Sequence, residues 1–237
     1  MRLDSYLVEN NLAQSRNKAQ SLIKEGLVSV NGKIIKKSAF KLTSEDRVHV
    51  GEHKAYVSRG AYKLLNFLAE IKLELKGKNA LDIGSSTGGF TQVLLEAEIG
   101  SVHCVDVGTQ QLHHSIRADK RVHVHEQCDI RDFQSDTQFD LVVSDVAFIS
   151  LLYILEDVNR LASADIILLF KPQFEVGREV KRDKHGVVLD NKAIAKAMQK
   201  FEDACALQKW SLQNKMPSSV TGKEGNLEYC YYFKKEV

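Results

Sequence analysis

The chain lacks the cysteine patterns of a disulfide-bonded scaffold or a zinc site. It has four cysteines in 237 residues, and no two of them form a C-x-x-C pair. A small secreted scaffold or a structural zinc site would bring cysteines together at regular spacing. We therefore expect reduced thiols in a cytosolic protein. The eight histidines show no ligand spacing either, so the sequence predicts no metal. The cysteines are Cys104, Cys128, Cys205 and Cys230.

Long hydrophobic segments are also absent. No apolar run is longer than 166–170, which is far short of the roughly 20 residues that a membrane-spanning helix needs. The start of the chain, Met1-Arg2-Leu3-Asp4, has an acid where a signal peptide would have its apolar core. The sequence thus favours a cytoplasmic protein with no membrane partner.

The net charge is only +2, but it is unevenly distributed. Residues 1–54 contain ten Lys and Arg against six Asp and Glu, which leaves +4 on this segment and −2 on the rest. A basic segment joined to a nearly neutral one suggests that the first binds a polyanion for the second. The alternative is a solvated charged face without a partner.

A glycine-rich turn at 84–89 is the most informative motif. The apolar run 80–83 leads into Gly84, Gly88 and Gly89, and an apolar helical pattern follows from Phe90. Glycines let the backbone turn sharply and approach a ligand closely, and a helix N-terminus favours a polar or anionic group. The spacing is G-x-x-x-G-G, so the dinucleotide fingerprint G-x-G-x-x-G is not met. An ordinary strand-to-helix turn is the plain alternative.

A second strand, 102–106, follows about twenty residues later and ends in Asp106. A carboxylate at this position can accept hydrogen bonds from a ribose diol. An acid in the first strand, Asp82, a glycine turn and an acid at the end of the second strand resemble the S-adenosylmethionine (SAM) site of class I methyltransferases.

The order of predicted elements divides the chain into a small α+β segment, 1–52, a linker, 53–57, and a larger α/β segment, 58–237. The first contains helices at 2–9 and from Ser15 to a stop at Gly26, a hairpin around Asn31-Gly32, and a strand at 47–50. The larger segment begins with a helix that we expect Ser58 to cap. Ala61, Leu64, Leu65 and Leu68 line one apolar face of this helix, and Lys63 lies outside that face.

Strands then alternate with helices, which predicts an open, mostly parallel sheet wound on both faces. Sites in such sheets lie at the carboxyl ends of the strands. A further helix at 190–209 and a C-terminal antiparallel hairpin, 216–220 with 227–233, complete the prediction. Alternation along the last strand puts Leu227, Tyr229, Tyr231 and Phe233 on one side and Glu228, Cys230 and Tyr232 on the other. The other strands are expected at 80–83, 102–106, 122–125, 141–145 and 166–170, and the helices at 91–98, 111–118 and 151–161.

The first segment resembles the S4 RNA-binding domain. The matching stretches are Arg2-Leu3-Asp4, the basic helix at 15–19, and 26–33. The resemblance implies RNA as the partner, with basic side chains on phosphates, contacts that position the RNA without specifying its sequence. The residues expected to contact RNA are Arg2, Arg16, Lys18 and Lys24, together with Arg59 and the charged loop residues Arg178, Lys181 and Arg182 of the larger segment. We expect that loop, 177–186, to form a mobile flap beside the site, or else a plain solvated loop.

The larger segment resembles the FtsJ-like ribose 2′-O-methyltransferases, whose Lys-Asp-Lys-Glu tetrad corresponds to Lys63, Asp145, Lys171 and Glu228. With the S4-like segment in front, the whole chain resembles the TlyA family, also known as haemolysin A. The matching stretches are 58–63, 82–91, 144–151 and 171–175. The resemblance implies a Rossmann-like class I SAM-dependent methyltransferase fold and 2′-O-methylation of a cytidine in 16S and/or 23S rRNA.

The tetrad has a physical rationale. A ribose 2′-hydroxyl is a poor nucleophile, and a positive Lys171 near its oxygen would stabilise the developing alkoxide. Asp145 and Glu228 would hold the two lysines in place. Since the sulfonium is already activated, positioning could supply much of the rate. Taken singly, each of the four could equally be a surface charge or a helix cap.

The cofactor residues follow from the same resemblance. Those expected on the methionine side of SAM are Asp82, Gly84, Ser85, Gly88, Gly89 and Phe90. Asp106 would take the ribose, and Asp129 would lie near the adenine amine, with Asp132 and Asp136 as neighbouring alternatives.

Two functions of other classes stay open at this point. A pore-forming cytolysin is one, and it is disfavoured by the lack of a membrane-length segment. An S4 RNA-binding protein whose second half has lost catalysis is the other, and it is disfavoured by the intact glycine turn and tetrad.

Overall fold

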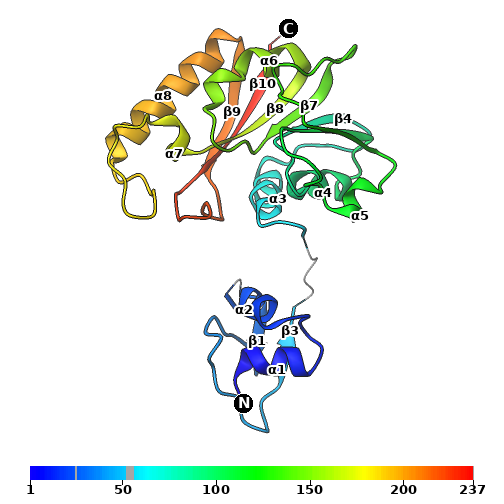
Figure 1. The fold of residues 1–237 in the computed structure, drawn as a ribbon, viewed down its shortest axis with the longest axis vertical. Helices are drawn as coiled ribbons and strands as arrows, with labels where there is room; N and C mark the ends of the chain where they lie inside the picture. Colours follow the sequence, from blue (N-terminus) through cyan, green and yellow to red (C-terminus); the bar gives the residue numbers. More distant parts are fainter. Residues whose placement is uncertain (25, 52–55, 237) are drawn as a thin grey trace. The chain divides into compact units, whose positions relative to one another are not determined.

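The computed structural model describes residues 1–24, 26–51 and 56–236, which fall into two compact units, Met1–Ala55 and Tyr56–Val237 (Figure 1). The predicted linker, 53–57, lies partly outside the described residues. Its last two residues bond to the second unit, since the Val57 amide donates to Gln92 Oε1 at 2.9 Å and the Tyr56 hydroxyl to Glu96 Oε2 at 2.9 Å.

The first unit packs two helices on a small antiparallel sheet of order β2-β1-β3. The predicted hairpin is confirmed, because Asn31 and Gly32 both have positive φ, 52° and 79°, as a tight two-residue turn requires. The Ser15 hydroxyl accepts from the Lys18 amide at 3.3 Å and caps the second helix. The elements are α1 (Leu3–Glu9), α2 (Arg16–Lys24), β1 (Val28–Val30), β2 (Lys33–Ile34) and β3 (Val48–Val50).

A buried carboxylate links the two helices of this unit. Asp4 is fully buried, and it accepts from Arg2 at 2.9 Å, from Arg16 at 3.1 Å and from Gln20 at 3.0 Å. The hydrogen bond from Arg2 is the main reason that the pKa of Asp4 lies far below its usual range. Two arginines expected to contact RNA therefore also hold the fold of the first unit.

The second unit is a seven-stranded sheet of order β6-β5-β4-β7-β8-β10-β9. Strands β6, β5, β4, β7 and β8 run parallel, while β10 pairs antiparallel with β8 and β9 antiparallel with β10. The predicted fold class, a doubly wound parallel sheet with a C-terminal antiparallel hairpin, is confirmed. The strands are β4 (Asn79–Ile83), β5 (Ser101–Asp106), β6 (Val122–Glu126), β7 (Phe139–Ser144), β8 (Ala162–Phe170), β9 (Trp210–Pro217) and β10 (Tyr229–Lys235).

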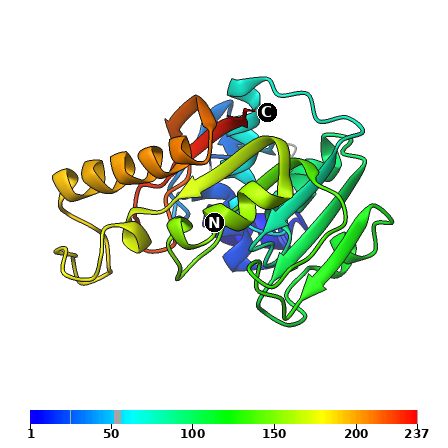
Figure 2. The same cartoon turned by 90° about the horizontal axis from the view of Figure 1, so that it is seen from above.

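Helices cover both faces of this sheet, as Figure 2 shows. One face buries Val158 and Phe201 of the helices α6 and α8, and the other buries Phe67 and Leu94 of α3 and α4. The predicted alternation in β10 is confirmed, because Tyr231 lies in the first core and Tyr232 in the second. The helices are α3 (Gly60–Ile71), α4 (Gly89–Glu96), α5 (His114–Arg117), η1 (Leu151–Tyr153), α6 (Leu155–Leu161), α7 (Pro172–Glu175) and α8 (Asn191–Leu207).

Several of the predicted helix and strand boundaries are wrong. The helix expected at 111–118 is the single turn α5, because the amides of 110–112 donate to the Glu126 carboxylate instead of continuing a helix. The helix expected at 151–161 is divided at Ile154, whose φ of −118° interrupts it. The strand expected at 216–220 ends at Pro217 and begins earlier, at Trp210.

Ser58 does not cap α3 with its side chain. The N-cap position is Arg59, which makes no side-chain capping bond. A Cβ at Gly89 would collide with the Ser58 hydroxyl, so this serine packs directly on the glycine turn. The start of α3 is thereby placed against the start of α4.

Candidate active site

The carboxyl ends of β4, β7 and β8 border two adjoining cavities. The larger, of about 750 Å³, contains all four predicted tetrad residues, and the smaller, of about 400 Å³, contains Asp106 and Asp129. This is the edge at which parallel sheets place their sites, because strand ends and loops there leave backbone groups free for a ligand. The two cavities share Gly84, Ser86, Asp145, Ala147 and Phe148.

The glycine turn brings the backbone close to both cavities. Gly84 and Gly88 have φ values of 76° and 91°, which side chains rarely adopt. A Cβ at Gly84 would also lie 3.1 Å from the Val146 side chain. A Cβ at Gly88 would lie 2.9 Å from Leu112, so both positions need glycine for their positive φ and for lack of space. Ser85 and Phe90, expected beside the cofactor, line the larger cavity with Gly89, whereas Gly88 packs against Leu112 and Ile116 behind the turn.

Asp82 is a fully buried acid at the cavity wall. Its Oδ2 accepts from the Thr91 hydroxyl at 2.6 Å, while its Oδ1 has no partner among the described residues. Burial raises the pKa of Asp82 to about 7, against the lowering effect of the Thr91 bond. An unpartnered buried carboxylate oxygen is costly, and a ligand cation such as an ammonium would satisfy it.

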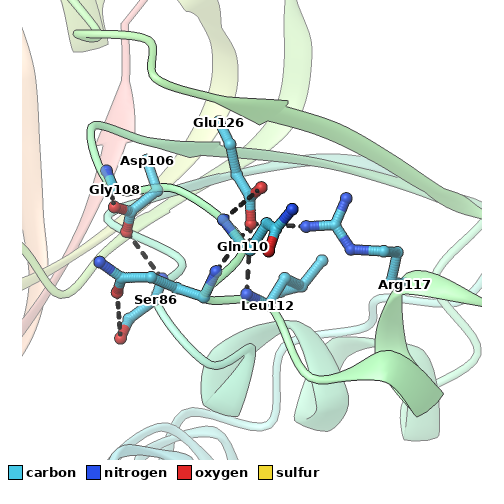
Figure 3. A network of polar contacts seen from close by, with 8 residues as sticks. Ser86, Asp106, Gly108, Gln110, Leu112, Arg117 and Glu126 are labelled. Atoms are coloured by element: carbon cyan, nitrogen blue, oxygen red, sulfur yellow. Dashed lines mark hydrogen bonds and ion pairs between the residues drawn. The ribbon is translucent and has the colours of Figure 1, made fainter.

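Two carboxylates fasten the loop after β5, as Figure 3 shows. Asp106 accepts from the Ser86 amide at 2.8 Å and from the Gly108 amide at 2.7 Å. Glu126, at the end of β6, accepts from the amides of Gln110, Gln111 and Leu112 and forms a 2.6 Å ion pair with Arg117. Asp106 therefore joins the glycine turn to the second strand and keeps free lone pairs for a ligand.

Asp129 lies in the wall of the smaller cavity with Cys128 and Ile130. Its carboxylate forms a 2.6 Å ion pair with Arg131, and this bond is the main cause of its lowered pKa. The neighbouring candidates Asp132 and Asp136 are not among the residues lining this cavity. The placement favours Asp129 among the three.

The tetrad forms two lysine–carboxylate pairs. Lys63 Nζ lies 2.6 Å from Glu228 Oε2, and Lys171 Nζ lies 2.6 Å from Asp145 Oδ1. Lys63, Lys171 and Glu228 are each no more than 8% exposed. Gln173 Nε2 donates to the second oxygen of Glu228 at 3.2 Å. The four residues come from helix α3, the ends of β7 and β8 and the start of β10. The fold thus brings Lys63 and Glu228 together although they are 165 positions apart in the chain.

Phe148, which has no role among the sequence-based predictions, is the most exposed large hydrophobic side chain described, at 92%. It borders both cavities, its ring lies 5.4 Å from that of Phe174, and its φ is 67°. Such a backbone conformation is unusual for a phenylalanine and is often found at functional sites. The sequence signals for it are its position three residues after Asp145 and its place in the matching stretch 144–151.

Glu175 was also left without a role. Its carboxylate accepts from the Ser150 hydroxyl at 2.5 Å and from the Leu151 amide at 2.8 Å, and burial raises its pKa. These bonds hold the far end of the loop that carries Asp145 and Phe148. Glu175 therefore positions this loop from α7.

The charged loop 177–186 lies beside the larger cavity, which Arg182, His185 and Gly186 line. The Arg182 guanidinium donates to four backbone carbonyls, of Gln173, Gly177, Arg178 and Val180, so it organises the loop itself. Arg178 and Lys181 are exposed. Arg59, at the start of α3, also lines this cavity.

Among the described residues, no group of three or more His, Cys, Asp and Glu side chains could hold a metal ion. No helix in the described part of the chain is long and apolar enough to cross a bilayer.

A parallel sheet with a glycine turn after its first strand and two ligand-sized cavities at its carboxyl edge defines a Rossmann-like α/β enzyme domain. Comparison with known proteins agrees. Residues 56–235 match the family model of the FtsJ-like methyltransferases, and residues 1–48 match the S4 domain.

Similar proteins extend over the whole chain. The chain is 47% identical to a 23S rRNA (cytidine-2′-O)-methyltransferase TlyA of Campylobacter jejuni, over 99% of this chain and 100% of that protein. It is 36% identical to a 16S/23S rRNA (cytidine-2′-O)-methyltransferase TlyA of Mycobacterium tuberculosis, over 100% and 90%. A solved structure described as a hemolysin of Streptococcus thermophilus matches with a TM-score of 0.74 at 32% identity, over 99% of this chain and 88% of that one. The chain therefore belongs to the family of FtsJ-like methyltransferases with an N-terminal S4 domain, that of the TlyA proteins.

Proposed function

We propose that this enzyme transfers a methyl group from SAM to the 2′-hydroxyl of a ribose in ribosomal RNA, with a cytidine of 16S and/or 23S rRNA as the target. The names of the TlyA relatives support the substrate. The observation that best supports this reaction type is the presence of two lysine–carboxylate pairs in one cavity beside the glycine turn. A cytoplasmic location follows from this substrate, since ribosomal subunits are found there.

The tetrad would act on the hydroxyl oxygen. Lys171, held by Asp145 at 2.6 Å, would place its ammonium beside the oxygen and stabilise the negative charge that develops there. Lys63, held by Glu228, would add a second positive charge in the same cavity. Because both lysines are nearly buried, their charges are screened less than surface charges would be. The two carboxylates fix the geometry of the lysines.

The cofactor residues fit SAM. The bound group supplies a methyl on a positively charged sulfur. We propose that the free oxygen of Asp82 accepts from its amino group, and that the carboxylates of Asp106 and Asp129 in the smaller cavity take the ribose and the adenine. The turn residues proposed on the methionine side are Gly84, Ser85, Gly88, Gly89 and Phe90.

We also propose that Phe148 and Phe174 receive the target base. An exposed aromatic ring at the border of the two cavities can stack on a base that has been taken out of its helix. The basic side chains Arg2, Arg16, Lys18 and Lys24 of the S4 unit would hold the RNA by its phosphates. Contacts of this kind give affinity and leave the choice of the nucleotide to the second unit.

The test uses labelled SAM and ribosomal subunits from a strain that lacks the enzyme. We expect label on a ribose of one or both rRNAs, and a 10²- to 10³-fold lower rate for Lys171→Met, roughly the effect of removing one charge-stabilising donor. The matched control is Lys78→Met, which removes a partly buried lysine of a carboxylate pair outside the tetrad, Lys78–Asp165, on the opposite edge of the sheet. The proposal is wrong if wild type binds SAM but labels no rRNA ribose. It is also wrong if Lys171→Met and Lys78→Met reduce the rate of methyl transfer by the same factor.

A further inference from the structure

Helix α8 carries an exposed lysine face beside the catalytic cavity. Lys192, Lys196 and Lys200 follow one another at four-residue intervals and are all exposed. Residues four apart lie on the same side of a helix, so the three ammonium groups form one row. The row extends over about 12 Å along the axis, at 1.5 Å per residue. We name it the α8 lysine row.

The charge pattern of α8 is the reverse of what helix stability favours. Its first ten residues contain these three lysines and no acid, and its last seven contain Glu202 and Asp203 and no base. The helix dipole favours acids near the N-terminus and bases near the C-terminus. Like charges four residues apart also repel, by about 0.2–0.5 kcal/mol a pair. The fold itself therefore gains nothing from this arrangement.

Partners inside the protein do not account for the row. In the described ranges, none of the three lysine ammonium groups makes an ion pair or a hydrogen bond, although the charge of Lys200 slightly opposes the rise that burial causes in the pKa of Glu175. The acids of the same helix have their own partners, since Glu202 pairs with Lys215 at 2.8 Å and Asp203 accepts from Gln199. The row is therefore available to a partner outside the chain.

The row begins at the rim of the larger cavity. Asp190, the N-cap of α8, follows directly on the loop segment that holds Val188, and the Val188 amide donates to Asn226 Oδ1 at 3.0 Å. Asn226 lines the larger cavity together with Glu228. Figure 1 shows the loop before α8 and the loop before β10 on the same side of the sheet, and Figure 2 shows α8 along an outer side of the second unit, with its N-terminal end outermost.

The local charge is also exceptional for this unit. Residues 177–200 contain seven Lys and Arg against three Asp and Glu, a net charge of +4. The rest of 56–237 contains 16 against 22, a net charge of −6. A basic band on an otherwise acidic domain, beside the active cavity, is the arrangement that guides a polyanionic strand to a site.

We infer that the α8 lysine row, continued by the exposed Arg178, Lys181 and Lys184 of the adjoining loop, binds the phosphodiester backbone of the substrate RNA next to the target nucleotide. This inference rests on the proposed function for its substrate. It assigns the second unit an RNA-binding surface of its own, in addition to the S4 unit. The row presents three ammonium groups in line, so it can contact up to three phosphates of one strand.

The experiment replaces the row by glutamine in the full-length protein, as Lys192→Gln with Lys196→Gln and Lys200→Gln. A matched control replaces Lys120, Lys209 and Lys234 by glutamine. These are also exposed, but they precede β6 and β9 or end β10, at the edge of the sheet opposite the cavities. A third variant replaces the row by arginine, which keeps the charge.

Binding is measured with in vitro transcribed 23S and 16S rRNA, and turnover with the separated subunits. We expect the row variant to bind the cognate rRNA about 50-fold more weakly at 0.15 M salt and to reduce the slope of log K against log salt by about 2–3, from three lost phosphate contacts. KM should rise while kcat and SAM affinity stay the same. The control and the arginine variant should resemble wild type.

The outcomes separate this inference from the proposed function. If wild type transfers no methyl group to rRNA, the proposed function fails, yet weaker rRNA binding by the row variant alone would still support the row. The inference would be overturned if the row variant and the control lost the same amount of rRNA affinity. It would also be overturned if the slope of log K against log salt were the same in the row variant as in wild type. So would weaker binding to intact subunits with unchanged binding to protein-free rRNA, because the row would then contact an acidic ribosomal protein.

Discussion

Asp82 should make cofactor affinity depend on pH. Its fully buried carboxyl has a pKa of about 7 in the free protein, and its Oδ1 lacks a partner. If an amino group of the ligand binds there as an ammonium, the carboxyl must be ionised in the complex. Affinity should therefore fall below pH 7 by about tenfold per pH unit, because one unit corresponds to about 1.36 kcal/mol.

The decline in affinity at high pH has a different cause. An α-amino group ordinarily has a pKa of about 7.7–8.0, so the ligand loses its positive charge above this range. Affinity should therefore be greatest between about pH 7 and 8. The stability of the free protein changes in the opposite direction, because the folded state holds a proton on Asp82 that the unfolded state releases above its ordinary pKa of 3.8. Without ligand, the protein thus loses stability as the pH rises from 3.8 to about 7.

The assay is calorimetric titration of S-adenosylhomocysteine between pH 5.5 and 8.5, in buffers of different ionisation enthalpy. We expect release of close to one proton per ligand near pH 6. Asp82→Asn should remove the decline below pH 7 and weaken binding at pH 7.5 by about 10- to 100-fold, the effect of one charge-assisted hydrogen bond of about 1.5–3 kcal/mol. Thr91→Val, which removes the 2.6 Å bond that lowers the pKa, should shift the decline to higher pH.

5′-Methylthioadenosine, which lacks the amino acid part, serves as the control ligand and should bind without this pH dependence. A flat profile for S-adenosylhomocysteine between pH 6 and 7.5 would refute the reasoning. So would an unchanged decline in Asp82→Asn, because the titrating group would then lie elsewhere.

Three further predictions concern the site and the sheet. Glu228→Gln removes the charge that holds Lys63, so single-turnover methyl transfer should slow by about 10- to 100-fold with unchanged SAM affinity; equal loss of SAM affinity would contradict this role. Phe148→Ala should raise KM for the subunits and lower kcat by about tenfold, while the melting temperature stays within a degree or two because the ring is 92% exposed; wild-type kinetics would exclude a role in base binding. Burial, with the neighbouring His123 and His125, lowers the pKa of His103 to about 4, so the folded state should lose about 1–2 kcal/mol as the pH falls from 6.5 to 4. Denaturant unfolding of His103→Gln should show a smaller loss over this range, and an equal loss would assign the acid sensitivity to other groups.

Local sequence was sufficient where a few neighbouring residues decide the backbone. Asn31-Gly32 turns the first hairpin because both residues tolerate positive φ, and Gly84 and Gly88 turn the chain after β4 for the same reason. The alternation in β10 predicted both core faces correctly, because side chains in a strand point to opposite sides. The doubly wound sheet followed from the order of these elements.

Long-range contacts changed the local pattern elsewhere. The helix expected at 111–118 was reduced to one turn by the carboxylate of Glu126, a residue of the next strand. Lys63 was read as a residue outside the apolar face of α3, yet it is 8% exposed, because Glu228 supplies its charge partner from 165 positions away. No periodicity of α3 contains that information.

The sequence by itself determined the two-part organisation to expect, the fold class, the glycine turn and the candidate site residues, because these depend on residue types and short spacings. Only the tertiary structure decided which charges meet. It joined the tetrad into two ion pairs, left Asp82 Oδ1 without a partner, committed Arg182 to the loop backbone and left the α8 lysine row exposed beside the cavity. Burial and pairing depend on atoms that come from distant parts of the chain, and the same lysine or aspartate has a different role in each surrounding.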